Sequence, residues 1–202
     1  MFMANSAGAA EVPDPTVTIR VYNYAEVSGG VLRGAEKEAS RIFTAAGVET
    51  VWLGCLNAQV KSRVVPVPND LAREAKCEGE VTGATIDLRI LPRSLPASKA
   101  FADATFGFAD GGYLASVFYA RLEDFARRGY WNQSETPVIL GDVIAHEIGH
   151  LLLGTNSHSR TGIMCGRWDR EYLRLLQEGF QTFSAEQSSA MRATVLRRGA
   201  QR

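Results

Sequence analysis

Residues 146–159 read HEIGHLLLGTNSHS and contain all three histidines of this 202-residue chain. Apolar residues surround the first two histidines, and Gly154 is the residue type that commonly follows the end of a helix. We therefore predict a helix over 137–153. Because positions i and i+4 lie on the same face of a helix, His146 and His150 are expected to lie one turn apart, where two imidazoles can bind one zinc ion.

Glu147 directly follows the first histidine and is rotated from it by about 100° around the predicted helix. A carboxylate at that position does not readily bind the same ion, but it reaches a water molecule on that ion. The HExxH pattern therefore predicts Glu147 as the general base of a metal-assisted hydrolysis. The alternative is a helix with two hydrogen-bonded histidines, a surface glutamate and no metal.

The third ligand has several candidates, because a catalytic zinc site takes three protein ligands and keeps one open position. His158 is the first candidate, since the three residues after Gly154 can return the chain toward the metal. Glu171 and Asp169 compete with it, because a carboxylate from a following helix is the third ligand of thermolysin-like sites. The residues alone leave these alternatives open.

The segment 161–165, TGIMC, places Met164 shortly after the last histidine. The order of HExxH, glycine, histidine and a turn with methionine resembles the metzincin zinc peptidases. The specific match lies within 146–164, and the order of expected strands and helices is similar over 16–198. The family pattern is HExxHxxGxxH, whereas this chain reads HExxHxxxGxxxH, with one more residue on each side of Gly154.

The resemblance implies a catalytic Zn²⁺ ion with three ligands, namely His146, His150 and His158. It further implies that Glu147 acts as general base and acid and that Met164 lies beneath the metal. The segment 105–109 would be an edge strand above the cleft that pairs with an extended peptide. The substrate-binding residues on that strand would be Phe106, Gly107 and Phe108.

The resemblance also implies that the residues after the methionine, 165–183, shape the substrate pocket. Trp168 and Tyr172 are the candidates for its walls. The pair His158-Ser159 is similar to the matrixin branch of the family. Position 166 is a glycine, so the metal-binding tyrosine of the astacin-like branch has no counterpart here.

Alternation and capping patterns predict the other elements of the fold. Strands are expected at 16–22, 48–53 and 86–90 and in two short segments of 105–119 around a turn at 110–112. Helices are expected at 28–46, 120–128, 169–178 and 184–198. Thr136 is expected to cap the central helix, with Pro137 in its first position. This order predicts an α+β fold, a mixed and twisted sheet with helices, which is the fold of a metzincin-like catalytic domain.

Composition restricts the partners of the chain. Basic and acidic residues number 22 each, and the net charge of +0 argues against a nucleic-acid binder. We find no run near the roughly 20 apolar residues that span a bilayer. The resemblance implies a peptide or protein substrate, and we expect a monomeric chain. The arginines of the last predicted helix are expected to face solvent.

The domain organisation and the compartment follow from length, composition and cysteines. The length predicts one catalytic domain over 16–202 after a flexible segment 1–15, which lacks the features of a complete signal peptide. Cys55 and Cys77 flank the same loop-like segment and are the natural pair for a disulfide; three reduced thiols are the alternative. The predicted disulfide and the extracellular location of similar peptidases favour a secreted or periplasmic protein.

The sequence as a whole predicts a zinc-dependent endopeptidase with Glu147 as general base. Two alternatives remain at this point. One is an inactive zinc-binding module that recognises peptides, and the other is a gluzincin-like peptidase with Glu171 as third ligand.

Overall fold

The computed structural model describes residues 15–55, 77, 83–92 and 106–200. Its elements in chain order are β1 (Thr16–Asn23), α1 (Gly29–Ala45), β2 (Glu49–Cys55), β3 (Thr85–Leu91), β4 (Gly107–Asp110), β5 (Leu114–Phe118), α4 (Tyr119–Arg127), the 3₁₀ turn η2 (Gln133–Glu135), α5 (Thr136–Leu153), α6 (Arg170–Gln177) and α7 (Ala185–Gly199). These elements confirm the predicted α+β fold. The predicted N-terminal segment lies outside the described residues except for Pro15.

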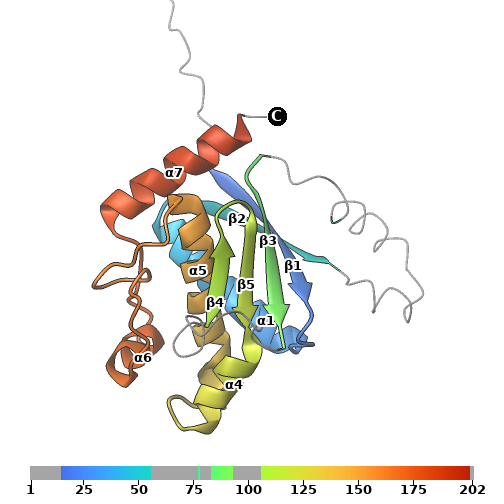
Figure 1. The fold of residues 1–202 in the computed structure, drawn as a ribbon, viewed down its shortest axis with the longest axis vertical. Helices are drawn as coiled ribbons and strands as arrows, with labels where there is room; N and C mark the ends of the chain where they lie inside the picture. The colour runs from blue at the N-terminus through green and yellow to red at the C-terminus, as the bar shows by residue number, and fades with distance from the viewer. Residues whose placement is uncertain (1–14, 56–76, 78–82, 93–105, 201–202) are drawn as a thin grey trace, which may run out of the picture.

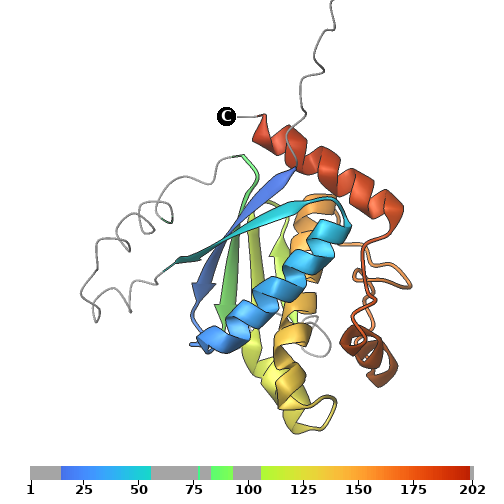
Figure 2. The same cartoon turned by 180° about the vertical axis from the view of Figure 1, so that it is seen from behind.

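The sheet has five strands in the order β2-β1-β3-β5-β4. Four strands pair in parallel, and only β4 runs antiparallel to its neighbour β5. Helices α1 and α5 lie on one face of the sheet, and α7 crosses the end of this helical layer (Figures 1 and 2). The mixed sheet therefore ends in an antiparallel edge strand next to the helix that carries HExxH.

The hydrophobic core lies between the sheet and these two helices. In β1, alternate residues are buried against the helices as predicted, namely Val17, Ile19 and Val21. In α1, the buried residues lie at helical spacing, namely Ala35, Ala39, Ile42 and Phe43. Gly141 of α5 lies so close to α1 that a Cβ atom there would be 2.7 Å from the carbonyl oxygen of Ala35. The close contact of α1 and α5 makes α5 the central helix of the domain.

The start of α5 differs from the prediction. Thr136 is the first residue of the helix rather than its cap. Asn132 begins the preceding 3₁₀ turn with a capping box, in which the Glu135 carboxylate accepts a hydrogen bond from the Asn132 backbone at 2.7 Å. The Thr136 hydroxyl instead accepts from the Trp131 indole at 3.4 Å. The preference of threonine for helix caps predicts the wrong residue here, because a 3₁₀ turn with its own capping box directly precedes α5.

Two of the three arginines of α7 differ from the prediction that they face solvent, whereas Arg197 is exposed as predicted. Arg192 donates to the carbonyl of Ala46 at the end of α1, at 2.7 Å. Arg198 donates to the carbonyl of Leu151 in the last turn of α5, at 2.8 Å. Cations are favourable at the C-terminal ends of helices, where backbone carbonyls lack helical partners. Helix α7 therefore caps the ends of both central helices from outside.

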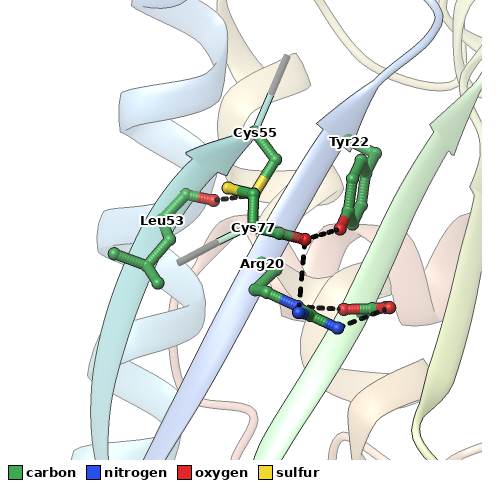
Figure 3. Close-up of a disulfide and its surroundings, with 6 residues drawn as sticks. Arg20, Tyr22, Leu53, Cys55 and Cys77 are labelled. Carbon is green, nitrogen blue, oxygen red and sulfur yellow. Dashed lines mark hydrogen bonds and ion pairs between the residues drawn. A yellow bond between two sulfur atoms is a disulfide. The ribbon is translucent and has the colours of Figure 1, made fainter. Parts of the chain in front are cut away.

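A disulfide joins Cys55, at the end of β2, to Cys77 (Figure 3). The backbone carbonyl of Cys77 accepts hydrogen bonds from Tyr22 at 3.0 Å and from Arg20 at 3.3 Å. The Arg20 guanidinium is buried and also binds both carboxylate oxygens of Asp87 on β3, at 2.6 and 3.0 Å. Cys77 is therefore fixed to the sheet by the covalent bond and by side chains of β1.

Replacing both cysteines, as in Cys55→Ser together with Cys77→Ser, is expected to lower the free energy of unfolding by about 3 kcal/mol, because the open chain regains the entropy of a loop that the disulfide closes. Chemical denaturation measures this change. Adding a reductant should destabilise the wild type by a similar amount and leave the double variant unchanged. Equal stability of the two proteins under oxidising conditions would contradict a stabilising disulfide.

Within the described residues, helix length and hydropathy together would allow a membrane span at one place. The segment Gln133–Leu153 has the length and the mean hydropathy, 1.2, of a spanning helix, but 83% of its window is buried inside the protein. This burial is typical of the core helix of a globular domain.

Candidate active site

The first two histidines extend from the last turns of α5, which ends at Gly154 in the left-handed conformation with φ of 65°. The Nε2 atoms of His146 and His150 lie 3.1 Å apart. Each Nδ1 atom lies 2.8 Å from a backbone carbonyl, that of Ile163 for His146 and that of Thr155 for His150. Because a carbonyl only accepts, both rings carry their proton on Nδ1, and both Nε2 lone pairs face the same point.

His158 completes a cluster of three imidazoles. Its ring centroid lies 5.2 Å from that of His146 and 5.0 Å from that of His150. Ligand nitrogens of the three rings all lie within 4.8 Å of one another. The backbone of Gly166 lies behind the His158 ring, since a Cβ atom at this glycine would be 2.8 Å from Cγ of the ring.

The donor set fits a zinc ion. Two nitrogen ligands at 2.0–2.1 Å in a tetrahedral site lie about 3.3 Å apart, close to the spacing of the two Nε2 atoms. Two lone pairs at such a distance repel each other unless a cation lies between them. Burial lowers the pKa of His146 to about 4, so this imidazole stays neutral and available as a ligand at neutral pH. Three imidazoles with one open position are the ligand set of a catalytic zinc site.

The competing third ligands lie elsewhere. Among the described residues, the three histidines form the only cluster of metal-binding side chains. Asp169 caps α6 by accepting a hydrogen bond from the backbone of Tyr172 at 2.9 Å. Glu171 is exposed in the first turn of α6 and does not line the cavity at the histidines. The structure thus brings His158, and neither carboxylate, to the first two histidines.

Glu147 is buried, with 5% of its surface exposed, and lines the same cavity as the three histidines. Burial raises the pKa of its carboxyl group to about 8. Gly107 of β4 lies directly against the carboxylate, because a Cβ atom at this glycine would be 2.6 Å from Oε1. Strand β4 therefore approaches Glu147 so closely that only glycine fits at position 107.

Met164 is fully buried in a turn behind α5. The Cys165 backbone donates to the carbonyl of Gly162 at 3.0 Å, and Gly162 adopts a positive φ of 74°. The Met164 sulfur lies close to Gly149, where a Cβ atom would be 2.6 Å from it. Since Gly149 lies between the two histidines of α5 in sequence, Met164 packs against the helix at the histidine cluster.

A cavity of about 230 Å³ opens at the cluster. One side comes from β4 and the residue before it; Phe106 is buried there, whereas Phe108 is 37% exposed. Another side comes from the segment after α5 and includes Trp168, whose indole lies 5.5 Å from the His146 ring and 5.1 Å from the Phe106 ring.

Tyr172 is a support rather than a wall of the cavity. It does not line the cavity, and its hydroxyl donates to the carbonyl of Gly162 at 2.9 Å. Of the two expected wall residues, only Trp168 therefore faces this cavity.

Sequence reasoning missed three residues of the site. Two are glycines that lie against site side chains, namely Gly149 and Gly166, and the third is Asn156 in the cavity wall. The sequence carried a signal only for Asn156, which lies in the stretch lengthened relative to the family pattern. The glycines are required by close approach in space, and that has no local signature.

Gly166→Ala is expected to raise the Kd for zinc by roughly 10- to 100-fold, the range seen when the support of a metal ligand is lost. The new methyl group would displace the His158 ring. Competition with a chromogenic chelator measures the affinity. Gly30→Ala is the matched control, because a Cβ atom at Gly30 has nothing within 4 Å. Wild-type affinity in Gly166→Ala would contradict a ligand role for His158.

Comparison with known proteins finds the same fold among solved structures. No protein-family model matches the chain, and no curated protein matches it significantly. A zinc-dependent peptidase from Methanocorpusculum labreanum matches with a TM-score of 0.54 and 18% identity, over 86% of this chain and 99% of that one. An archaemetzincin from Methanopyrus kandleri matches with a TM-score of 0.54 and 15% identity, over 90% of this chain and 96% of that one. This chain therefore has the fold of these two peptidase structures.

Proposed function

We propose that the chain is a zinc-dependent endopeptidase of the metzincin type, with Glu147 as general base. The observation that carries this proposal is that three convergent imidazoles and a buried carboxylate line one cavity beside an edge strand. Two solved structures with this fold are a zinc-dependent peptidase and an archaemetzincin, which supports the same chemistry here.

The three histidines would hold one zinc ion through ring nitrogens. The rings of His146 and His150 are already oriented for this, because each Nδ1 atom donates to a backbone carbonyl. Bound there, zinc would lower the pKa of a water molecule to about 7 and polarise the scissile carbonyl. Met164 packs against Gly149 of α5, and its neighbour Ile163 offers the carbonyl that accepts a hydrogen bond from His146.

Glu147 moves the proton of the reaction. Its carboxylate accepts a proton as water attacks the carbonyl carbon, and it gives this proton to the departing amine nitrogen when the C–N bond breaks. The products are a carboxylic acid and an amine, and the acid then passes its proton to the amine to give a carboxylate and an ammonium group. Burial raises the pKa of Glu147 to about 8, so the carboxyl group is able to hold a proton near neutral pH. Contact with Gly107 restricts where the carboxylate can lie.

The substrate would bind along β4. This strand pairs with β5 and is the last strand of the described sheet. An extended peptide can add to such an edge through backbone hydrogen bonds. Phe106 and Phe108 would contact the side chains of the peptide, and Gly107 would bring its backbone next to Glu147.

The test combines metal analysis with cleavage. The purified protein should bind one zinc ion per chain and cut an unstructured protein at internal bonds, as mass spectrometry of the products shows. A chelator should abolish cleavage, and added zinc should restore it. A zinc-loaded protein that cleaves no peptide library between pH 5 and 9 would overturn the proposal and favour the zinc-binding recognition module.

The lengthened motif favours this second candidate, since the connection between the second and third histidines differs from the family pattern. We also propose a monomer in an oxidising compartment, secreted or periplasmic, and the disulfide between Cys55 and Cys77 supports the latter. Sedimentation and thiol counting of the protein from its native source test both statements.

A further inference from the structure

The cavity has one neutral polar side chain that the proposed chemistry does not use as ligand or base. Of its described lining residues, the charged or ring-nitrogen groups are Glu147, the three histidines and the Trp168 indole, and most others are apolar or glycine. Asn156 is the exception. It lies in the segment after α5, so it belongs to a different part of the cavity lining from β4.

The backbone around Asn156 is fixed on its N-terminal side. The carbonyl of Thr155 accepts the Nδ1 proton of His150 at 2.8 Å. The hydroxyl oxygen of Thr155 accepts from the backbone N–H of Ser157 at 3.1 Å, which closes a short turn around Asn156. These bonds hold the main chain at Asn156 in place in the cavity wall, so no rearrangement of the backbone is needed to present its carboxamide to a ligand.

We propose that Asn156 is a substrate-binding residue whose carboxamide hydrogen-bonds the backbone of the bound peptide. The inference rests on the proposed peptidase function. A carboxamide has one acceptor oxygen and two donor hydrogens, which match the C=O and N–H groups of a peptide. Strand β4 contacts one edge of an extended peptide, and Asn156 contacts backbone groups that β4 leaves free. The site thus selects extended main chain, with little demand on side chains at that position.

Binding without turnover tests this role. The parent protein is the zinc-loaded Glu147→Gln variant, and fluorescence anisotropy measures the Kd of a labelled peptide that the wild type cleaves. Adding Asn156→Ala is expected to raise this Kd roughly tenfold, the effect of one lost hydrogen bond, with zinc content unchanged. Arg160→Ala is the control, because Arg160 is exposed in the same connection and does not line the cavity.

Backbone probes separate a direct contact from a disturbed turn. Each residue of the peptide is replaced in turn by its α-hydroxy acid, which removes one N–H and weakens the adjacent carbonyl as an acceptor. The parent should lose affinity at the position that contacts Asn156, and Asn156→Ala should show no further loss at that position alone.

The outcomes distinguish this inference from the proposed function. If the wild type cleaves and the parent binds, but Asn156→Ala binds as tightly as the parent or loses affinity equally with every probe, the Asn156 inference fails alone. If the wild type cleaves no peptide and the parent binds none, the proposed function fails and this inference fails with it.

Discussion

Glu147→Gln is expected to lower kcat for peptide hydrolysis by about 10²- to 10⁴-fold, because an amide cannot accept the proton of the attacking water. The zinc content should stay at one ion per chain, since the three imidazoles are unchanged. Steady-state cleavage and metal analysis of the same sample measure both quantities. A variant that keeps wild-type kcat would show that Glu147 is not the general base.

The same substitution is expected to stabilise the metal-free protein at high pH. Burial raises the pKa of folded Glu147 from 4.5 to about 8, so the folded carboxyl group keeps its proton where the unfolded one has lost it. The free energy of unfolding therefore falls as pH rises from about 4.5 to 8, by several kcal/mol and about 5 at most. Glutamine does not titrate and avoids this cost.

Denaturant unfolding of the two metal-free proteins between pH 4.5 and 9 measures this difference. The wild type should lose stability relative to Glu147→Gln as pH rises. His146 titrates in the opposite direction, since its lowered pKa costs stability as pH falls below 6.5, but this contribution is common to both proteins. A stability difference that does not change with pH would contradict the burial of an ionisable Glu147.

Loss of His158 is expected to have the second largest effect. Loss of a residue that supports a metal ligand raises the Kd for zinc by roughly 10- to 100-fold, and loss of the ligand itself in His158→Ala should raise it further. Peptide cleavage should fall as zinc is lost. The reason is that two imidazoles remain where a catalytic site needs three ligands. Glu171→Ala is the matched control, because this carboxylate lies apart from the cluster. Zinc loss in Glu171→Ala with zinc retained in His158→Ala would instead support the thermolysin-like alternative.

Features with a local signature could be predicted from the sequence. The alternation of β1 and the apolar face of α1 each follow from one periodic pattern, and the structure confirms both elements. The HExxH spacing is likewise local, because helix geometry alone places His146 and His150 one turn apart.

Features that depend on distant segments could not be predicted. Arg192 and Arg198 look like solvent-facing residues of an amphipathic helix, yet each reaches a carbonyl at the end of another helix. Gly107 and Gly166 are needed because other segments pack against them, and the sequence does not say which segments meet. The position of His158 could be predicted only in part, as the first of several candidates for the third ligand, since its approach depends on how the lengthened connection folds.

The zinc-loaded protein offers the most direct test of the central claim, through X-ray absorption at the zinc edge combined with a crystal structure of the same preparation. The account predicts one zinc ion with three imidazole nitrogens at 2.0–2.1 Å, from His146, His150 and His158, and an open fourth position facing Glu147. A zinc ion bound by only two of these imidazoles, with the His158 ring turned to solvent, would contradict it.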